Sequence, residues 1–265
     1  MLPVLFEIGR LPIRSYGLAM AVAFLAGIWL ARRRARGSGI NPDIIIDLAF
    51  FVILASIAGA RAAYVGVHWG HFRLDPAAIP RVWDGGLAQY GGIAAGILVG
   101  VLFLKRRGVP VWTGTDIVAP SLALGVAIGR VGCFLNGCCF GKPCDLPWAV
   151  TFPPVSAAGQ QFPGTPLHPT QLYESLAALG VLAVLLLVER RKPFDGFLLW
   201  LFVILLSAYR FIIDPIRYYE PMSVVSREAG PALTSNQVIG IALLAVSAVA
   251  MLVLARRQKT RGARG

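Results

Sequence analysis

The chain has 265 residues, of which 57% are hydrophobic and 14% are charged, and its mean hydropathy is +0.69. Ordinary soluble domains carry about 25% charged residues, so this composition excludes that class and indicates an integral membrane protein. The 25 Lys and Arg residues outnumber the 13 Asp and Glu residues, which gives a net charge of +12 at pH 7. Nucleic-acid binding is the competing explanation of so basic a chain. The positions of the basic residues decide between the two.

Apolar stretches recur along the whole chain, and most approach the ~20 residues that a helix needs to span a bilayer. We predict an all-α, polytopic membrane protein with about seven transmembrane helices and short outer-face segments, forming a single transmembrane domain over residues 1–265. The first stretch has no basic segment before it, so we expect a retained helix rather than a signal peptide. The predicted helices cover residues 17–32, 44–66, 87–105, 116–136, 170–189, 195–217 and 235–255, and a basic cytoplasmic tail covers 256–265.

Basic clusters follow every second predicted helix. They lie at residues 32–36, 105–107, 190–192 and 256–264. Basic residues beside membrane helices stay on the cytoplasmic side, so the pattern predicts an amino terminus outside and a carboxyl terminus in the cytoplasm. The clusters lack interleaved aromatic residues, so we predict no nucleic-acid partner. We expect these basic residues to interact with anionic membrane lipids instead.

Four other arginines lie within the apolar stretches, each towards the end that this topology places outside. Ionisable groups inside a membrane helix are costly, and they default to functional hypotheses. For any single arginine, snorkelling of the side chain to the interface is the alternative. Four in one leaflet favour a site for an anionic lipid headgroup. They are Arg61, Arg130, Arg210 and Arg217.

The last two of these arginines share a helix face with an acidic residue. Arg210, Asp214 and Arg217 follow i, i+4, i+7 spacing, so Asp214 can pair with either guanidinium. Pro215 disturbs the same turn. A charged stripe of this kind is expected to face the bundle interior rather than lipid.

Two glycine-rich segments, 81–92 and 129–141, flank the third and fourth predicted helices. Glycine permits tight turns and close approach of the backbone. A glycine-rich loop can therefore present backbone N–H groups to an anion. Close packing of membrane helices through small residues is the alternative explanation.

Six segments carry motifs of one known family, and the two most specific are the glycine-arginine segment and the run His168-Pro169-Thr170-Gln171-Leu172-Tyr173-Glu174. The six segments are residues 13–18, 59–61, 81–86, 129–141, 168–174 and 209–214. On these motifs the chain resembles bacterial prolipoprotein diacylglyceryl transferases nearly from end to end.

The resemblance implies a multi-pass transferase of the bacterial inner (cytoplasmic) membrane with its active site towards the outer leaflet. Such an enzyme moves the diacylglyceryl group of phosphatidylglycerol onto the lipobox cysteine thiol of a prolipoprotein signal peptide. A thioether forms and glycerol phosphate is released. The resemblance implies no cofactor and no metal.

The arginines suit this chemistry. Cationic groups raise the thiolate fraction of a thiol whose pKa is near 8.5, and guanidinium groups can clamp a phosphate as negative charge grows on it. We predict Arg130 and Arg210 as catalytic residues, together with Tyr90, which stands where family members often carry a histidine base. Tyrosine is a poor base at pH 7, so we expect Tyr90 to position the substrate. Two alternatives for thiol activation are the arginines alone and an outer histidine such as His68 or His71. The predicted substrate-binding residues are Arg61, Tyr16, Asn136, Gly141, Asp214 and His168.

The glycine-arginine segment departs from the family pattern at two cysteines. Cys133 replaces a common asparagine and Cys138 a common glutamate, and Cys139 and Cys144 lie close by. The segment has no flanking CxxC pair, and adjacent cysteines are awkward ligands for a tetrahedral zinc ion, so we expect no metal. An oxidising outer compartment favours a disulfide, for example one involving Cys144.

Two alternatives from other classes remain. A transporter can also place arginines around an anionic substrate, but we find no internal repeat, and the polar groups gather in one leaflet rather than at the midplane. A non-catalytic lipid-binding paralogue is the second alternative, because the departures at Tyr90 and Cys138 touch positions relevant to activity. Formation of a thioether-linked peptide distinguishes the transferase from both.

Overall fold

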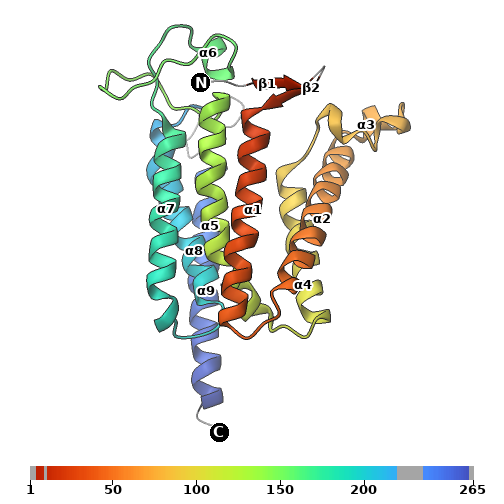
Figure 1. The fold of residues 1–265 in the computed structure, drawn as a ribbon, viewed down its shortest axis with the longest axis vertical. Coiled ribbons are helices and arrows are strands. Elements are labelled where there is room, and N and C mark those ends of the chain that lie inside the picture. The colour runs from red at the N-terminus through yellow and green to blue at the C-terminus, as the bar shows by residue number, and fades with distance from the viewer. Residues whose placement is uncertain (1–3, 9–10, 220–234, 263–265) are drawn as a thin grey trace. The chain divides into compact units, whose positions relative to one another are not determined.

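The protein is described by a computed structural model that covers residues 4–8, 11–219 and 235–262. Its long elements are helices (Figure 1), which confirms the predicted fold class. The long helices are α1 (Ser15–Gly37), α2 (Asp43–Val67), α4 (Gln89–Arg106), α5 (Val111–Asn136), α7 (Thr170–Val188), α8 (Phe197–Ile213) and α9 (Ser235–Gly262).

Short elements connect these helices or precede them. The sequence did not predict the antiparallel hairpin before α1, in which Val4 pairs with Arg14 and Ile8 with Leu11. The remaining elements are β1 (Val4–Ile8), β2 (Leu11–Arg14), the helices α3 (Trp69–Phe72) and α6 (Ala157–Gln161), and the 3-10 turns η1 (Pro76–Ala78), η2 (Val82–Asp84), η3 (Glu189–Arg191) and η4 (Asp214–Ile216).

Six of the described helices, α1, α2, α5, α7, α8 and α9, are long and apolar enough to cross a membrane. The predicted third span also forms a helix, α4, but Gln89 begins it and Lys105 and Arg106 end it, so its apolar stretch is shorter. The protein is therefore a polytopic membrane protein. The count of seven spans and the orientation stay predictions.

Four helix boundaries differ from the predicted ones by four residues or more. Helix α1 ends at Gly37 rather than at residue 32, and α8 ends at Ile213 rather than at residue 217. Helix α5 begins at Val111 rather than at residue 116, because the buried carboxylate of Asp116 is satisfied inside the fold and does not mark a helix end. Helix α9 continues to Gly262, so much of the predicted basic tail is helical. The last three residues of that tail, 263–265, lie outside the described residues.

The chain forms two compact units, one from residues 31–114 and the other from residues 1–30 together with 115–265. In the first unit, α2 and α4 approach through small residues. A Cβ atom at Gly92 would lie 2.9 Å from the carbonyl oxygen of Ser56, and one at Gly96 would lie 2.5 Å from the Ser56 hydroxyl. Such contacts let membrane helices pack at short range.

In the second unit, α5, α7 and α8 run side by side (Figure 1) and share an apolar core. Each helix contributes two buried residues to this core, which lies at the end of the bundle where α5 and α8 begin and α7 ends. The buried residues are Ala119, Ala123, Val181, Leu185, Leu198 and Phe202.

One buried carboxylate fixes the start of α8 against α5. Asp116 Oδ1 accepts hydrogen bonds from the backbone N–H groups of Leu198 (2.9 Å) and Leu199 (3.3 Å), and Oδ2 accepts one from Gly196 (2.9 Å). The first N–H groups of a helix have no partner within it, so Asp116 caps α8 from a neighbouring helix. Lys192 pairs with the same carboxylate at 2.9 Å. Burial lowers the pKa of Lys192, but its hydrogen bonds to Asp195 and Asp116 outweigh that effect and raise it.

We predict that Asp116→Ala destabilises the fold by about 3–5 kcal/mol, because it leaves buried amide groups and a lysine without their acceptor. Thermal unfolding of the purified protein in detergent measures this. Asp43→Ala is the control, since it removes an exposed ion pair with Arg32 and should cost less than about 1 kcal/mol. Equal unfolding temperatures for the two variants would contradict the capping role.

Candidate active site

Three arginines share one buried carboxylate in the second unit. Glu174, near the start of α7, is only 4% exposed. Its Oε1 accepts hydrogen bonds from Arg217 Nη1 at 2.6 Å and from Arg210 Nη1 at 3.3 Å, and its Oε2 pairs with Arg130 Nε. We call Glu174, Arg130, Arg210 and Arg217 the arginine cluster. Three positive charges against one negative charge leave the cluster with a net charge of +2.

The antiparallel arrangement of the helices brings these side chains together. Arg130 lies late in α5, Glu174 early in α7 and Arg210 late in α8, so all three lie at the same end of the bundle. The Asp116 cap lies at the opposite end, where α5 and α8 begin. Asp116 thus joins α5 to the start of α8, and Glu174 gathers arginines of α5 and α8 onto α7 at the other end of the bundle.

Backbone pairing outside the helices places Arg217. The α-helical turns of α8 end at Ile213, and η4 leads into a short extended segment in which Arg217 forms an antiparallel bridge with Gly141. Flanking hydrogen bonds join Lys142 N to Ile216 O (2.8 Å) and Tyr218 N to Phe140 O (3.1 Å). The connection between α5 and α7 therefore fixes the position of this arginine.

That connection folds over an aromatic core of its own. The core contains Phe140, Phe152, Ala158 and Leu167, and Tyr218 stacks on Phe140 with 5.4 Å between ring centroids. Gly141, a predicted site residue, approaches the chain before α7 closely, since a Cβ atom there would lie 2.8 Å from His168 O. These positions of His168 and Gly141 stabilise the segment that carries Arg217.

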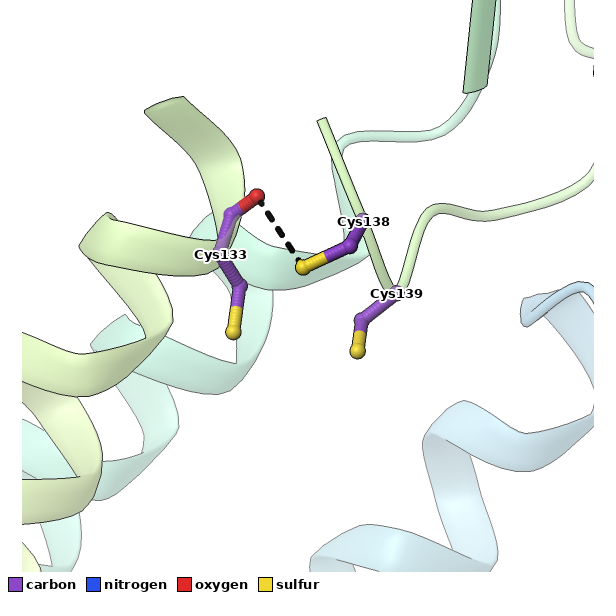
Figure 2. A group of neighbouring side chains, drawn as sticks. All are labelled: Cys133, Cys138 and Cys139. Carbon is purple, nitrogen blue, oxygen red and sulfur yellow. Dashed lines mark hydrogen bonds between the residues drawn. The ribbon is translucent and has the colours of Figure 1, made fainter. Parts of the chain in front are cut away.

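Three cysteine thiols gather where α5 ends and the following loop begins (Figure 2). The Sγ atoms of Cys133, Cys138 and Cys139 all lie within 4.8 Å of one another. Cys138 Sγ donates to the carbonyl oxygen of Cys133 at 3.7 Å. All four cysteines of the chain, Cys144 included, are free, so the expected disulfide does not form in this structure.

The charges around Cys139 favour its thiolate. Hydrogen bonds with Cys133 and then Cys138 hold the pKa of Cys139 below its ordinary value, and the positive charges of Arg217 and Arg130 act in the same direction, while burial opposes them. The cysteines therefore lie within the electrostatic field of the arginine cluster.

Several buried polar atoms at this end of the bundle have no hydrogen-bond partner among the residues that the structure describes. Two are donors of the site: the hydroxyl of Tyr209, which precedes Arg210, and the Nε group of Arg217. The others are His168 Nδ1 and Gln171 Oε1. A buried polar group without a partner costs about 1–3 kcal/mol, so these atoms are suited to receive a polar ligand.

The remaining predicted residues of this unit have separate positions. Tyr16 begins α1 and lies against Gly132, where a Cβ atom would be 3.6 Å from the Tyr16 ring. Asn136 is the last residue of α5. Asp214 is buried and accepts a 2.6 Å hydrogen bond from the hydroxyl of Tyr219. Burial and this hydrogen bond raise the pKa of Tyr219 to about 12, so its phenol stays protonated as a donor at neutral pH.

The sequence predicted Asp214 as the partner of Arg210 and Arg217, but the structure pairs both arginines with Glu174. The difference arises at η4, because Arg217 leaves the helical face that an uninterrupted i+7 spacing would give it. Sequence reasoning therefore missed the central residue of the site. A signal for it was present, since Glu174 is the only charged residue of α7.

Arg61 and Tyr90 belong to the other unit. Tyr90 is exposed near the start of α4. Arg61 is buried, and each of its guanidinium nitrogens donates to backbone carbonyls of the segment after α3. The acceptors are Ile79 (2.8 Å), Ala78 (2.6 Å), Gly85 (2.7 Å) and Gly86 (3.0 Å). These bonds give Arg61 a structural role in its own unit. Contacts of Arg61 and Tyr90 with substrate stay predictions.

A family model described as prolipoprotein diacylglyceryl transferase matches residues 3–253. The chain belongs to this family. The matched region contains the whole arginine cluster.

Individual relatives agree with the family model, and three of them carry the name phosphatidylglycerol–prolipoprotein diacylglyceryl transferase. The protein of Thermosynechococcus vestitus is 39% identical over 213 residues, which is 80% of this chain and 80% of that protein. The protein of Synechococcus elongatus is 44% identical over 193 residues, or 71% of this chain and 65% of that protein. The protein of Bacillus velezensis is 34% identical over 259 residues, or 97% of this chain and 93% of that protein.

We predict that Glu174→Gln lowers the stability of this diacylglyceryl transferase family member by about 3–5 kcal/mol, because three neighbouring guanidinium groups lose their shared counter-charge. An anionic phospholipid supplied in the detergent micelle should restore more of the unfolding temperature in this variant than in the wild type, since it binds the folded state. Thermal unfolding with and without the lipid measures both effects.

Asp145→Asn is the matched control, because it also removes one carboxylate charge but at an exposed position. Its unfolding temperature should follow the wild type in both conditions. A Glu174→Gln variant that behaves like Asp145→Asn would show that the carboxylate does not hold the cluster together.

Proposed function

We propose that the protein transfers the diacylglyceryl group of phosphatidylglycerol to the cysteine thiol of a prolipoprotein, as the names of its relatives state for them. Family membership supports the reaction class. The observation that carries the proposal is the net positive charge of the arginine cluster in a largely buried site. Such a site suits an anionic lipid headgroup.

The charge of the cluster suits the leaving group better than the bound lipid. The phosphodiester of phosphatidylglycerol carries one negative charge. When the thiolate attacks the glyceryl carbon, the carbon–oxygen bond breaks and its electron pair leaves on the phosphate oxygen, which gives a second negative charge. The guanidinium groups of the cluster therefore attract the phosphate more strongly in the transition state than in the ground state, which is the condition for catalysis.

The arginines have distinct roles in this proposal. Arg130 and Arg210 are 20% and 27% exposed, so parts of both guanidinium groups remain accessible to a phosphate. Arg217 is more deeply buried than either. Its Nη1 lies 2.6 Å from Glu174 Oε1, whereas Arg210 Nη1 lies 3.3 Å from the same oxygen, so the main role of Arg217 is to hold the carboxylate in place. The hydroxyl of Tyr209, which precedes Arg210 in the sequence, is a neutral donor that can also bind the phosphate.

The thiol substrate comes from the lipobox cysteine of a signal peptide in this proposal. A thiol has a pKa near 8.5, so only a few per cent is thiolate at neutral pH, and a field of guanidinium groups raises that fraction. Tyr90 positions the peptide, because a phenol is a poor base at neutral pH. The remaining binding contacts come from Tyr16 and Asn136.

The proposed location is the bacterial inner membrane, with the site in the outer leaflet. Glu174 lies at one end of α7, while Arg190 and Arg191 follow the other end. Basic residues beside membrane helices stay cytoplasmic, so this asymmetry supports an outward-facing arginine cluster.

We predict that the purified protein, given labelled phosphatidylglycerol and a lipobox peptide, forms a thioether-linked diacylglyceryl peptide and free glycerol phosphate. Arg130→Ala and Arg210→Ala should each reduce the rate by about 10- to 100-fold, because a hydrogen bond to a charged group contributes roughly 1.5–3 kcal/mol. Mass spectrometry of the peptide and release of the label measure the reaction.

Arg107→Ala is the matched control, since it removes an exposed arginine paired with Asp47, and it should keep the wild-type rate. A peptide with serine in place of the lipobox cysteine should give no product. Lipid binding without a thioether product would instead identify a non-catalytic lipid-binding protein, and wild-type rates in both cluster variants would exclude the proposed clamp.

A further inference from the structure

The three gathered thiols form a second chemical feature that the arginine clamp does not use. Cys133 comes from the end of α5, and Cys138 and Cys139 come from the loop that follows (Figure 2). Their sulfur atoms lie within 4.8 Å of one another. In a tetrahedral zinc site the Zn–S distance is about 2.3 Å, which places sulfur atoms ~3.8 Å apart. Small side-chain movements therefore suffice to bring all three into such a site.

The backbone of the loop overcomes the difficulty that adjacent cysteines pose for a metal site. Cys139 has a φ of +60°, the only positive value among the non-glycine residues that the structure describes. Residues with side chains rarely adopt this conformation, and it costs about 1–3 kcal/mol unless the surroundings impose it. The reversal lets Cys138 and Cys139 direct their sulfur atoms to one place, although consecutive side chains normally diverge.

Two buried side chains hold the loop in this conformation through hydrogen bonds to its backbone carbonyls. Gln171 Nε2 donates to Cys138 O at 2.8 Å, and Thr170 Oγ1 donates to Cys139 O at 3.0 Å. Both donors are fully buried at the start of α7. The sulfur positions are therefore set by the fold and need no bond among the cysteines themselves.

The surrounding charge suits a thiolate-bound cation. Metal ligands must be deprotonated thiolates, and the positively charged Arg130 lies one turn before Cys133 on α5. Three thiolates around Zn²⁺ carry a net charge of −1, which the excess positive charge of the arginine cluster can balance. An anionic metal site is thus less costly here than elsewhere in an apolar bundle.

We propose that Cys133, Cys138 and Cys139 bind one Zn²⁺ ion and leave its fourth position open. No fourth His, Cys, Asp or Glu joins this group within the described part of the chain. Three protein ligands with one open position are typical of catalytic rather than structural zinc.

The open position has a specific use, which rests on the proposed transferase function. The substrate thiol binds Zn²⁺, releases its proton to solvent and becomes a thiolate at neutral pH. Its sulfur then attacks the glyceryl carbon, a carbon–sulfur bond forms, and the carbon–oxygen bond breaks with its electron pair on the departing phosphate. The product thioether is neutral and leaves the metal. This supplies the thiol activation that Tyr90 provides poorly.

Cobalt(II) tests the metal site, because it replaces zinc and absorbs light through sulfur-to-metal charge transfer. The full-length protein in detergent is reduced, stripped with a chelator under anaerobic conditions and titrated with Co²⁺. We expect one Co²⁺ per chain with a charge-transfer band that Zn²⁺ abolishes. Cys139→Ser and Cys133→Ala should each weaken Co²⁺ binding at least about 10-fold, while Cys144→Ser, the matched control, should bind as the wild type does.

Thermal unfolding verifies that each variant is folded. Because two single variants are tested, the experiment still gives a result if one of the two fails to fold. Three results would overturn the proposal. They are no stoichiometric binding by folded wild-type protein, unchanged binding in both cluster variants, and a native cysteine pair already oxidised when thiols are counted without reductant. Binding of Cu⁺ but not of Zn²⁺ or Co²⁺ would also overturn it.

A lipobox peptide tests the open position. Addition of the cysteine peptide should raise the charge-transfer intensity by about one third, as three Co–S bonds become four, and the serine peptide should leave it unchanged. An unchanged spectrum with both peptides would overturn the role of the fourth position. Full transfer activity in metal-free protein would refute the zinc mechanism and keep the transferase, whereas Co²⁺ binding without transfer in any metal state would refute the transferase alone.

Discussion

The site depends on the ion pairs that the carboxylate of Glu174 forms with three arginines. The carboxylate holds guanidinium groups from two helices and from the segment after η4 within one small volume. Two like charges 4 Å apart repel by about 4 kcal/mol at the effective dielectric constant near a protein surface, so three arginines would separate without it. One carboxylate is enough to gather them and too little to neutralise them. The remaining positive charge gives the site its capacity for an anion.

Asp116 and Glu174, two of the three buried carboxylates described in this unit, show how burial can serve either stability or binding. Asp116 receives three backbone N–H groups and one lysine, so the protein itself satisfies its charge and the site is closed. The partners of Glu174 among the described residues are three guanidinium groups, whose summed positive charge exceeds its single negative charge. The first fixes the register of α5 and α8, and this places Arg130 and Arg210 at the other end of the bundle. The Asp116 cap at one end of the bundle thereby helps to position the arginine cluster at the other end.

The sequence predicted the features that depend on local composition. The apolar stretches identified the membrane helices, and the cost of buried charge identified Arg130 and Arg210. The partner of these arginines could not be derived from spacing, because Glu174 lies on a different helix and Pro215 breaks the local periodicity that suggested Asp214. The close approach of the cysteines depends on one backbone angle at Cys139. Contacts between distant segments and isolated dihedral angles leave little trace in residue patterns.

The position of Arg217 in a backbone bridge also constrains how the chain can be assembled in the membrane. A ribosome makes Arg130 before Glu174, and Arg210 and Arg217 only afterwards. When α7 first enters the bilayer, its carboxylate can therefore pair only with Arg130 among the three arginines that it finally binds. An unpaired charge in lipid is costly, so α7 gains by inserting directly beside α5. The order of synthesis thus gives the bundle a defined first pair, to which α8 is added when its own arginines emerge.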